Sequence, residues 1–241
     1  ILHGAVNKLR NTLRAFTAYV PRDLVNDLVR SGNDIELGGE SRYLTILFTD
    51  LQGFSSISEV TPSRELVRLV SSYLALVTYA VKEETGTVDK FIGDSVMAFW
   101  GAPMLDQNHA YHACRAAVKS QRRMVELNRQ FATEGLPPLT VRIGIHSDAV
   151  LVGNIGSPER MSYTVMGDGV NIAARLQGEA EPGGICISQT VYDVVRNRLA
   201  LSVTSLGARE LKNIQQAIPI YRILIAANDG TPAPTPVAPR K

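Results

Sequence analysis

The order of strand-like and helix-like segments constrains the fold of this chain more than any other feature of its sequence. A short apolar β-rich run precedes an amphipathic helix, two runs separated by Gly93-Asp94-Ser95, a second long helix and two further runs. These segments are expected at residues 43–49, 62–84, 87–92, 96–100, 107–133, 139–146 and 150–155. This order predicts an α+β fold with a ferredoxin-like split βαββαβ core and C-terminal additions. The sheet is expected to be rich in antiparallel pairs, with helices packed on one face.

The additions are expected to be a helix at 169–179, a strand at 185–188, a helix from Thr190, and strands near 201–205 and 218–225. Within the core, the segments 139–146 and 150–155 are expected to form a hairpin. Asp148 would lie in its turn, because Asp tolerates the backbone angles that turns require.

The two ends of the chain differ in composition from the core. Apolar residues recur at helical spacing from Leu9 to Val20, so residues 1–40 are expected to form a helical connector. A helix that caps the domain and a signalling linker that dimerises both explain this pattern. Residues 227–241 contain four prolines and few apolar groups, and are expected to be a disordered tail. Because the chain starts at Ile1, we expect an excised fragment whose upstream part carries a membrane or sensor module.

Composition excludes several classes of protein. Hydrophobic residues make up 45% of the chain and charged residues 20%, which argues against a mainly disordered protein. Lys and Arg number 25 against 23 Asp and Glu, and this balance predicts no nucleic-acid partner. No run reaches the roughly 18 apolar residues of a membrane-spanning helix. The two cysteines lack metal-ligand spacing and cannot form a disulfide framework, which predicts a reducing, cytoplasmic location.

Two aspartates stand where expected strands end. Asp50 closes the first apolar strand, and Asp94 occupies the tip of the hairpin that the fold places beside it. Two facing carboxylates repel unless one takes a proton or a cation binds, and Mg²⁺ is held by one or two carboxylates together with substrate phosphates. Gly53 permits the amides of Phe54 and Ser55 to approach phosphate oxygens. A cap residue at Asp50 and an ordinary turn residue at Asp94 explain the same pattern.

A second pair, Asn171 and Arg175, lies four residues apart and therefore on one face of the helix expected at 169–179. An amide orients a sugar, and a guanidinium makes bidentate contacts with a phosphate. A solvent-exposed helix face without a ligand also accounts for this pair.

Four runs occur in a fixed order along the chain: 48–55, 87–98, 142–146 and 167–175. Together they resemble the catalytic domain of class III nucleotidyl cyclases of the bacterial adenylyl cyclase type, over residues 41–226. The resemblance implies an adenylate cyclase, a phosphorus–oxygen lyase that converts ATP to 3′,5′-cyclic AMP and pyrophosphate by a two-metal mechanism. A guanylyl cyclase and a catalytically silent cyclase-like domain used for dimerisation or sensing are the alternatives.

The resemblance also implies a role for individual residues. Asp50 and Asp94 match the ligands of two Mg²⁺ ions, which Mn²⁺ can replace, and the main-chain carbonyl of Leu51 matches a further ligand. Lys90 and Thr164 match the pair that reads the purine. Lysine donates to an adenine ring acceptor and the threonine oxygen accepts from the exocyclic amine, so this pair indicates ATP.

The remaining matches concern the ribose and the phosphates. Asn171 matches the residue that orients the ribose, and Arg175 matches the arginine that stabilises the transition state. Lys212 and Arg142 match phosphate contacts, with a structural role as the alternative for Arg142. The resemblance implies that the metal ligands come from one chain and the purine, ribose and arginine residues from its partner. A homodimer would then form two shared active sites.

Overall fold

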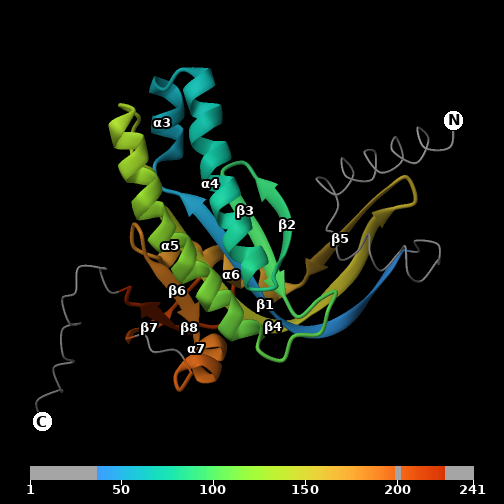
Figure 1. Cartoon of the computed structure of the whole chain (residues 1–241). Helices are drawn as coiled ribbons and strands as arrows, with labels where there is room; N and C mark the ends of the chain where they lie inside the picture. The colour runs from blue at the N-terminus through green and yellow to red at the C-terminus, as the bar shows by residue number, and fades with distance from the viewer. Residues whose placement is uncertain (1–36, 199–201, 226–241) are drawn as a thin grey trace, which may run out of the picture.

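The computed structural model describes residues 37–198 and 202–225 (Figure 1). The core elements are β1 (Gly38–Leu51), α4 (Ser63–Glu83), β2 (Thr87–Ile92), β3 (Ser95–Trp100), α5 (His109–Thr133) and β4 (Val141–Ser157). The others are α3 (Phe54–Val60), β5 (Arg160–Met166), α6 (Asp168–Glu179), β6 (Ile185–Ser188), α7 (Gln189–Val195), β7 (Val203–Arg209) and β8 (Ile218–Ile223). The helix expected near Leu9 to Val20 and the tail at 227–241 lie outside the described residues.

The strands form one sheet in the order β2-β3-β1-β4-β6-β8-β7, and β5 pairs with β4 outside this path. The β2, β3, β1 and β4 pairs are all antiparallel, and β4 and β6 are parallel. This is the expected ferredoxin-like core with C-terminal additions. The strand that lies beside β1 is β3, the second strand of the β2–β3 hairpin.

The expected hairpin at 139–146 and 150–155 is wrong, because both segments belong to the single long strand β4. The whole length of β1 pairs with β4, from Gly38 opposite Asn154 to Leu51 opposite Val141. Asp148 therefore lies within this ladder, opposite Leu44, and not in a turn. The hairpin forms one segment later, where β4 pairs with β5, a strand that the sequence pattern did not predict.

Helices cover both faces of the sheet, and the expectation of one covered face is also wrong. On β1, Leu47 packs in a cluster with residues of α4, α5 and α7, whereas its neighbour Phe48 packs in a second cluster with Ala173 of α6. Residues 44 to 49 of β1 are all buried, and a strand that is buried on both sides needs cover on both sides. Figure 1 shows α4 and α5 together on one side of the sheet.

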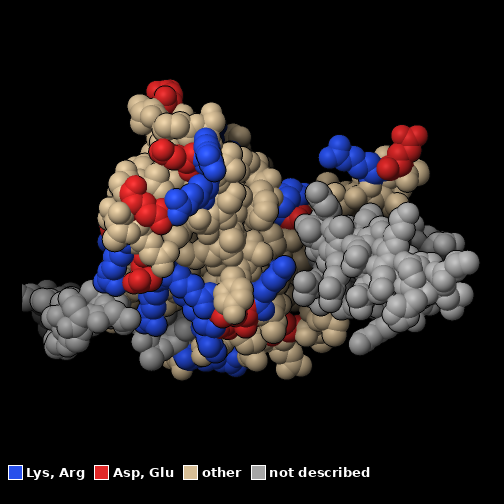
Figure 2. Space-filling view, turned by 45° about the horizontal axis from the view of Figure 1, so that its top comes forward, with Lys and Arg blue, Asp and Glu red and all other residues tan. Residues whose placement is uncertain are grey.

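Charged side chains join the C-terminal end of α4 to α5, with Glu84 buried and Glu83 partly exposed. The Lys119 ammonium lies 2.6 Å from the carboxylate of Glu84, and the Arg123 guanidinium lies 2.7 Å from that of Glu83. Figure 2 accordingly shows Lys and Arg beside Asp and Glu on the face that it displays. Among the described helices, none has the length and apolar character that crossing a membrane requires.

Candidate active site

The carboxylates of Asp50 and Asp94 come together at one end of the sheet, where β1 ends and β2 turns into β3. The Leu51 backbone N–H donates a hydrogen bond to Asp94 Oδ2 at 3.2 Å. Burial raises the pKa of Asp94, and the negative charge of Asp50 raises it further. The two aspartates are therefore neighbours that repel one another, as the sequence pattern predicted.

A hydroxyl network below these aspartates holds the hairpin against β1. The Thr49 hydroxyl accepts a hydrogen bond from the backbone N–H of Val96 at 3.0 Å and shares a second hydrogen bond with the hydroxyl of Tyr73 on α4. Gly93, at φ +63°, makes the tight turn that places Asp94 at the tip. Residues of β1, α4 and the β2–β3 hairpin, which are distant in sequence, thus position the carboxylate of Asp94.

Arg142 lies directly opposite Asp50 in the β1–β4 ladder. Its guanidinium donates to Asp50 Oδ2 at 2.6 Å. The Arg142 Nε is buried and makes no hydrogen bond to any residue that the structure describes. Arg142 therefore orients the Asp50 carboxylate, and its contact with a substrate phosphate stays a prediction.

The donor groups at this end of the sheet fit a hard divalent cation. Asp50 and Asp94 supply two carboxylates, and the described residues contain no group of three or more His, Cys, Asp and Glu side chains that would hold a metal by themselves. Mg²⁺ suits such a pair because it takes oxygen ligands and completes its shell with water and substrate phosphates. The raised pKa of Asp94 marks negative charge that a cation would neutralise.

The segment after β1 forms a short helix, α3, which the sequence pattern did not predict. Gly53 precedes it in the left-handed conformation, at φ +67°. Phe54 and Ser55 are its first two residues, so their N–H groups lack partners within the helix. Phe54 is partly buried against the core, whereas Ser55 is exposed. The expected phosphate contact of these amides stays a prediction.

Lys90 and Thr164 meet across a long separation in sequence, as expected for a pair that reads one base. The Lys90 ammonium donates to Thr164 Oγ1 at 3.1 Å. Asp89, which the sequence analysis missed, completes the group because the Thr164 hydroxyl donates to its carboxylate. Asp is depleted in β-strands, so its presence within the β-rich run 87–92 was the available signal.

The side chains of Asn171 and Arg175 are both exposed on α6, and neither side chain forms a hydrogen bond or ion pair with another described residue. The close packing of α6 on β4 depends on Gly144. A Cβ at this position would lie 2.2 Å from the backbone nitrogen of Gln177 and 2.5 Å from the backbone oxygen of Ala173. Only glycine fits without moving the helix that carries the predicted ribose and phosphate residues.

Lys212 lies apart from the other predicted residues. It is exposed in the connection between β7 and β8. Ile220, just beyond this connection, pairs with Ser188 at the end of β6. Asp50 pairs with Arg142 at the start of β4, and β4 runs parallel to β6. Asp50 is therefore near the start of β6, whereas the connection that carries Lys212 is near its end. The structure does not bring Lys212 to the aspartates of its own chain.

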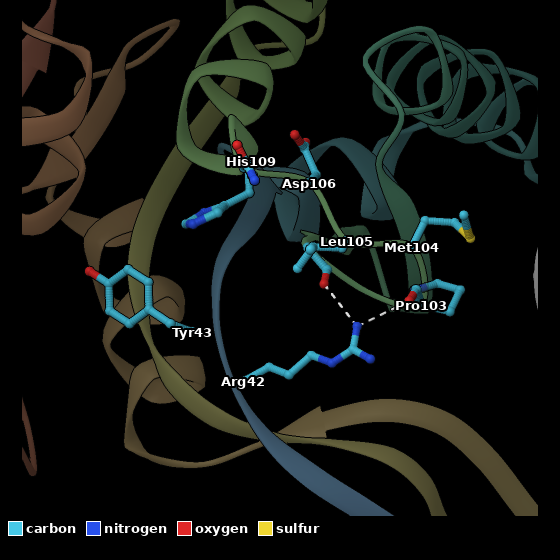
Figure 3. Close-up of a pocket in the computed structure, with 9 residues that line it drawn as sticks. Arg42, Tyr43, Pro103, Met104, Leu105, Asp106 and His109 are labelled. Carbon is cyan, nitrogen blue, oxygen red and sulfur yellow. Dashed lines mark hydrogen bonds between the residues drawn. The ribbon is translucent and has the colours of Figure 1, made fainter.

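A separate pocket of about 620 Å³ lies between the start of β1 and the loop from β3 to α5. Figure 3 shows the Arg42 guanidinium in this pocket, where it donates to the carbonyls of Gly101 and Pro103 at 3.2 and 3.0 Å. Tyr43 and His109 also line it. The residues predicted for the active site do not contribute to its lining.

The class of protein follows from three features together: the paired aspartates, the ferredoxin-like core and the exposed polar pair on α6. The chain belongs to the family of adenylate and guanylate cyclase catalytic domains, whose model matches residues 39–224. The expected class III cyclase domain is confirmed.

Individual relatives place the chain within this family. It is 36% identical over 226 residues to adenylate cyclase 1 of Rhizobium meliloti, covering 92% of this chain and 34% of that protein. The crystal structure of the adenylyl cyclase CyaB from P. aeruginosa matches with a TM-score of 0.75 and 31% identity, over 80% of this chain and 99% of that one. The guanylyl cyclase Cya2 matches with a TM-score of 0.73 and 32% identity, over 80% and 98%. The chain thus spans about a third of the length of the Rhizobium relative.

Proposed function

We propose that this chain is the catalytic domain of an adenylate cyclase, which converts ATP to 3′,5′-cyclic AMP and pyrophosphate. The observation that carries the proposal is the meeting of Asp50 and Asp94 in a fold whose helix α6 presents Asn171 and Arg175 to solvent. The similarity to adenylate cyclase 1 of Rhizobium meliloti and to the adenylyl cyclase CyaB supports this proposal.

Each group has a separate task. Asp50 and Asp94, with the main-chain carbonyl of Leu51, hold two Mg²⁺ ions or Mn²⁺ in their place. When bound, these ions lower the pKa of the ribose 3′-hydroxyl and neutralise the triphosphate. Lys90 donates to the adenine ring, and Thr164 accepts from the exocyclic amine.

The residues of α6 act on the ribose and the reacting phosphate. Asn171 orients the ribose so that its 3′-oxygen lies in line with the α-phosphorus. Arg175 stabilises the negative charge that develops on the α-phosphate oxygens, and loss of one such group typically costs about a hundredfold in rate. Lys212, and Arg142 beyond its contact with Asp50, bind the terminal phosphates.

The active site is shared between two copies of the chain. Among the described residues, no hydrogen bond or ion pair joins the aspartates to Lys90, Thr164 or the pair on α6. A two-fold homodimer would bring the aspartates of one copy against the base-reading and α6 residues of the other, which gives two equivalent sites. The exposure of Asn171 and Arg175 fits this arrangement, because each needs a partner.

Mixing inactive variants tests the shared site. Asp94→Ala and Arg175→Ala are each expected to be inactive. An equimolar mixture regains about a quarter of wild-type activity, because half of the dimers are mixed and each of these holds one intact site of two. A mixture of Asp50→Ala with Asp94→Ala is the matched control and stays inactive, since both changes damage the same half of every site. Recovery in the control, or none in the first mixture, would refute the shared site.

A guanylate cyclase is the second candidate, because Cya2 is as similar in sequence and fold as CyaB. Product formation from ATP and from GTP in parallel separates the two. A higher kcat/KM for GTP would overturn the choice of ATP, and absence of product from either nucleotide would favour a silent domain.

The proposal places the domain in the cytoplasm, which supplies ATP and keeps the buried, unpaired Cys114 and Cys186 reduced.

A further inference from the structure

Asp89 lies in a β-bulge on the edge strand β2. The pairing of β2 with β3 shifts between Val88 and Lys90, so Asp89 is the extra residue of the strand. The side chains of adjacent residues in a regular strand point to opposite faces of the sheet, and a β-bulge changes their directions. The bulge therefore allows the carboxylate of Asp89 to lie 3.3 Å from the ammonium of Lys90, the next residue.

The Asp89 carboxylate is enclosed although its strand lies at the sheet edge. Its side chain is 1% exposed, whereas that of Lys90 is 43% exposed. The carboxylate accepts hydrogen bonds from the Thr164 hydroxyl and from the backbone N–H of Val165, both on β5. A buried acidic group thus lies directly behind the two side chains that face a purine in the proposed function.

These contacts determine which groups remain free for a ligand. Thr164 has one hydroxyl proton, which it donates to Asp89, and two lone pairs, one of which accepts from Lys90. The Lys90 ammonium has three N–H groups, of which Thr164 and Asp89 take two. One acceptor on Thr164 and one donor on Lys90 are left, side by side.

This arrangement matches the Watson–Crick edge of adenine and opposes that of guanine. Adenine offers the ring acceptor N1 beside the donor N6–H₂, so both of its groups find partners. Guanine offers the donor N1–H beside the acceptor O6, and would meet a donor with a donor and an acceptor with an acceptor. Thr164 could donate to O6 only if its proton were free.

We propose that Asp89 is a positioning residue that fixes the Thr164 hydroxyl as an acceptor and thereby selects adenine over guanine nucleotides. The inference rests on the proposed function of Lys90 and Thr164. It adds a residue that touches no substrate and acts through the proton of another side chain.

The ratio of kcat/KM for ATP to kcat/KM for GTP is the quantity to measure in variants of the intact chain. The side-chain amide introduced by Asp89→Asn can either accept a hydrogen bond from the Thr164 hydroxyl or donate one to it. In this variant, the Thr164 hydroxyl is therefore free to rotate and to donate its proton to a guanine O6. The ratio is expected to fall about tenfold. Asp106→Asn is the matched control, because Asp106 is also largely enclosed and accepts from neighbours at the opposite end of the sheet. It leaves the ratio unchanged.

A double variant separates this role from a merely structural one. If Asp89 acts through the Thr164 hydroxyl, then Asp89→Asn has no further effect on the ratio in a Thr164→Val background. An equal fall in both backgrounds, or an unchanged ratio in the single variant, would overturn the proposal. Wild-type protein that forms no cyclic AMP, or that prefers GTP, would refute the proposed function instead.

Two further measurements cover the case in which Asp89→Asn does not fold. Asp89→Ser keeps a small group that both donates and accepts, and is expected to lower the ratio in the same direction. In the wild-type protein, purine riboside triphosphate keeps the N1 acceptor but lacks the 6-amino group, so its kcat/KM is expected to be about tenfold below that of ATP. Equal use of the two nucleotides would show that no acceptor is read there, and the proposal would fail.

Discussion

Acid is expected to destabilise this domain through His146, which lies inside the sheet on β4. The imidazole is buried, and its Nδ1 shares a hydrogen bond with the hydroxyl of Ser188 at 2.8 Å. Burial lowers the pKa of His146 from 6.5 to about 4, and the carboxylate of Asp148 offsets this only in part. The folded protein therefore keeps this ring neutral over a pH range in which the unfolded chain protonates it.

The size of the effect follows from linkage. Because the folded pKa is depressed, the unfolded state binds more protons between the two values, and stability is lost as the pH falls from 6.5 towards 4. The loss from this ring is about 2 kcal/mol on going from neutral pH to about pH 5, and about 3 kcal/mol at about pH 4. Above pH 6.5 the contribution to stability is complete.

Urea unfolding at a series of pH values measures this contribution. His146→Asn keeps a group that bonds Ser188 but cannot titrate, so its free energy of unfolding should vary less between neutral pH and about pH 5. The difference between wild type and variant should shrink by about 2 kcal/mol over that interval. A difference that stays constant with pH would refute the reasoning, whatever the stability of the variant at neutral pH.

Three other features of the structure give predictions. Gly144→Ala puts a methyl group against the backbone of α6, so we expect a loss of about 1–3 kcal/mol in urea unfolding together with loss of cyclic AMP formation; a variant as stable and active as wild type would contradict this. Burial raises the thiol pKa of Cys114 and Cys186 to about 12, so a thiol reagent should label neither until the protein is unfolded; rapid labelling of the folded protein would be the contrary result. Burial and the neighbouring charge of Asp50 raise the pKa of Asp94, so protons compete with Mg²⁺ for this carboxylate as the pH falls, and Mg²⁺ should bind more weakly there by calorimetry. An affinity independent of pH would show that Asp94 is not a ligand.

Local sequence was enough to predict the elements that depend on their own residues. The β2–β3 hairpin follows from the turn at Gly93-Asp94, and both long helices follow from their apolar periodicity. The meeting of Asp50 with Asp94 could also be predicted, because the order of the elements places the hairpin beside the first strand.

Elements that depend on distant partners could not be predicted in this way. Ser147-Asp148 resembles a turn locally, but pairing with β1 keeps it in a continuous strand. The strand β5 gains its partner only from β4, and the place of the predicted helix α6 on the second face depends on the burial of β1 from both sides. In each case, hydrogen bonds or buried area from another segment outweigh the local preference.

The amino-acid sequence by itself determined in what order the core elements of this protein follow one another, and it predicts which residues carry chemistry. Only the tertiary structure decided how those residues are held, with Arg142 on Asp50 and Asp89 behind Lys90 and Thr164. The physical reason is that a hydrogen bond between side chains 92 or 75 positions apart depends on strand register and on a bulge, and neither leaves a local pattern in the chain.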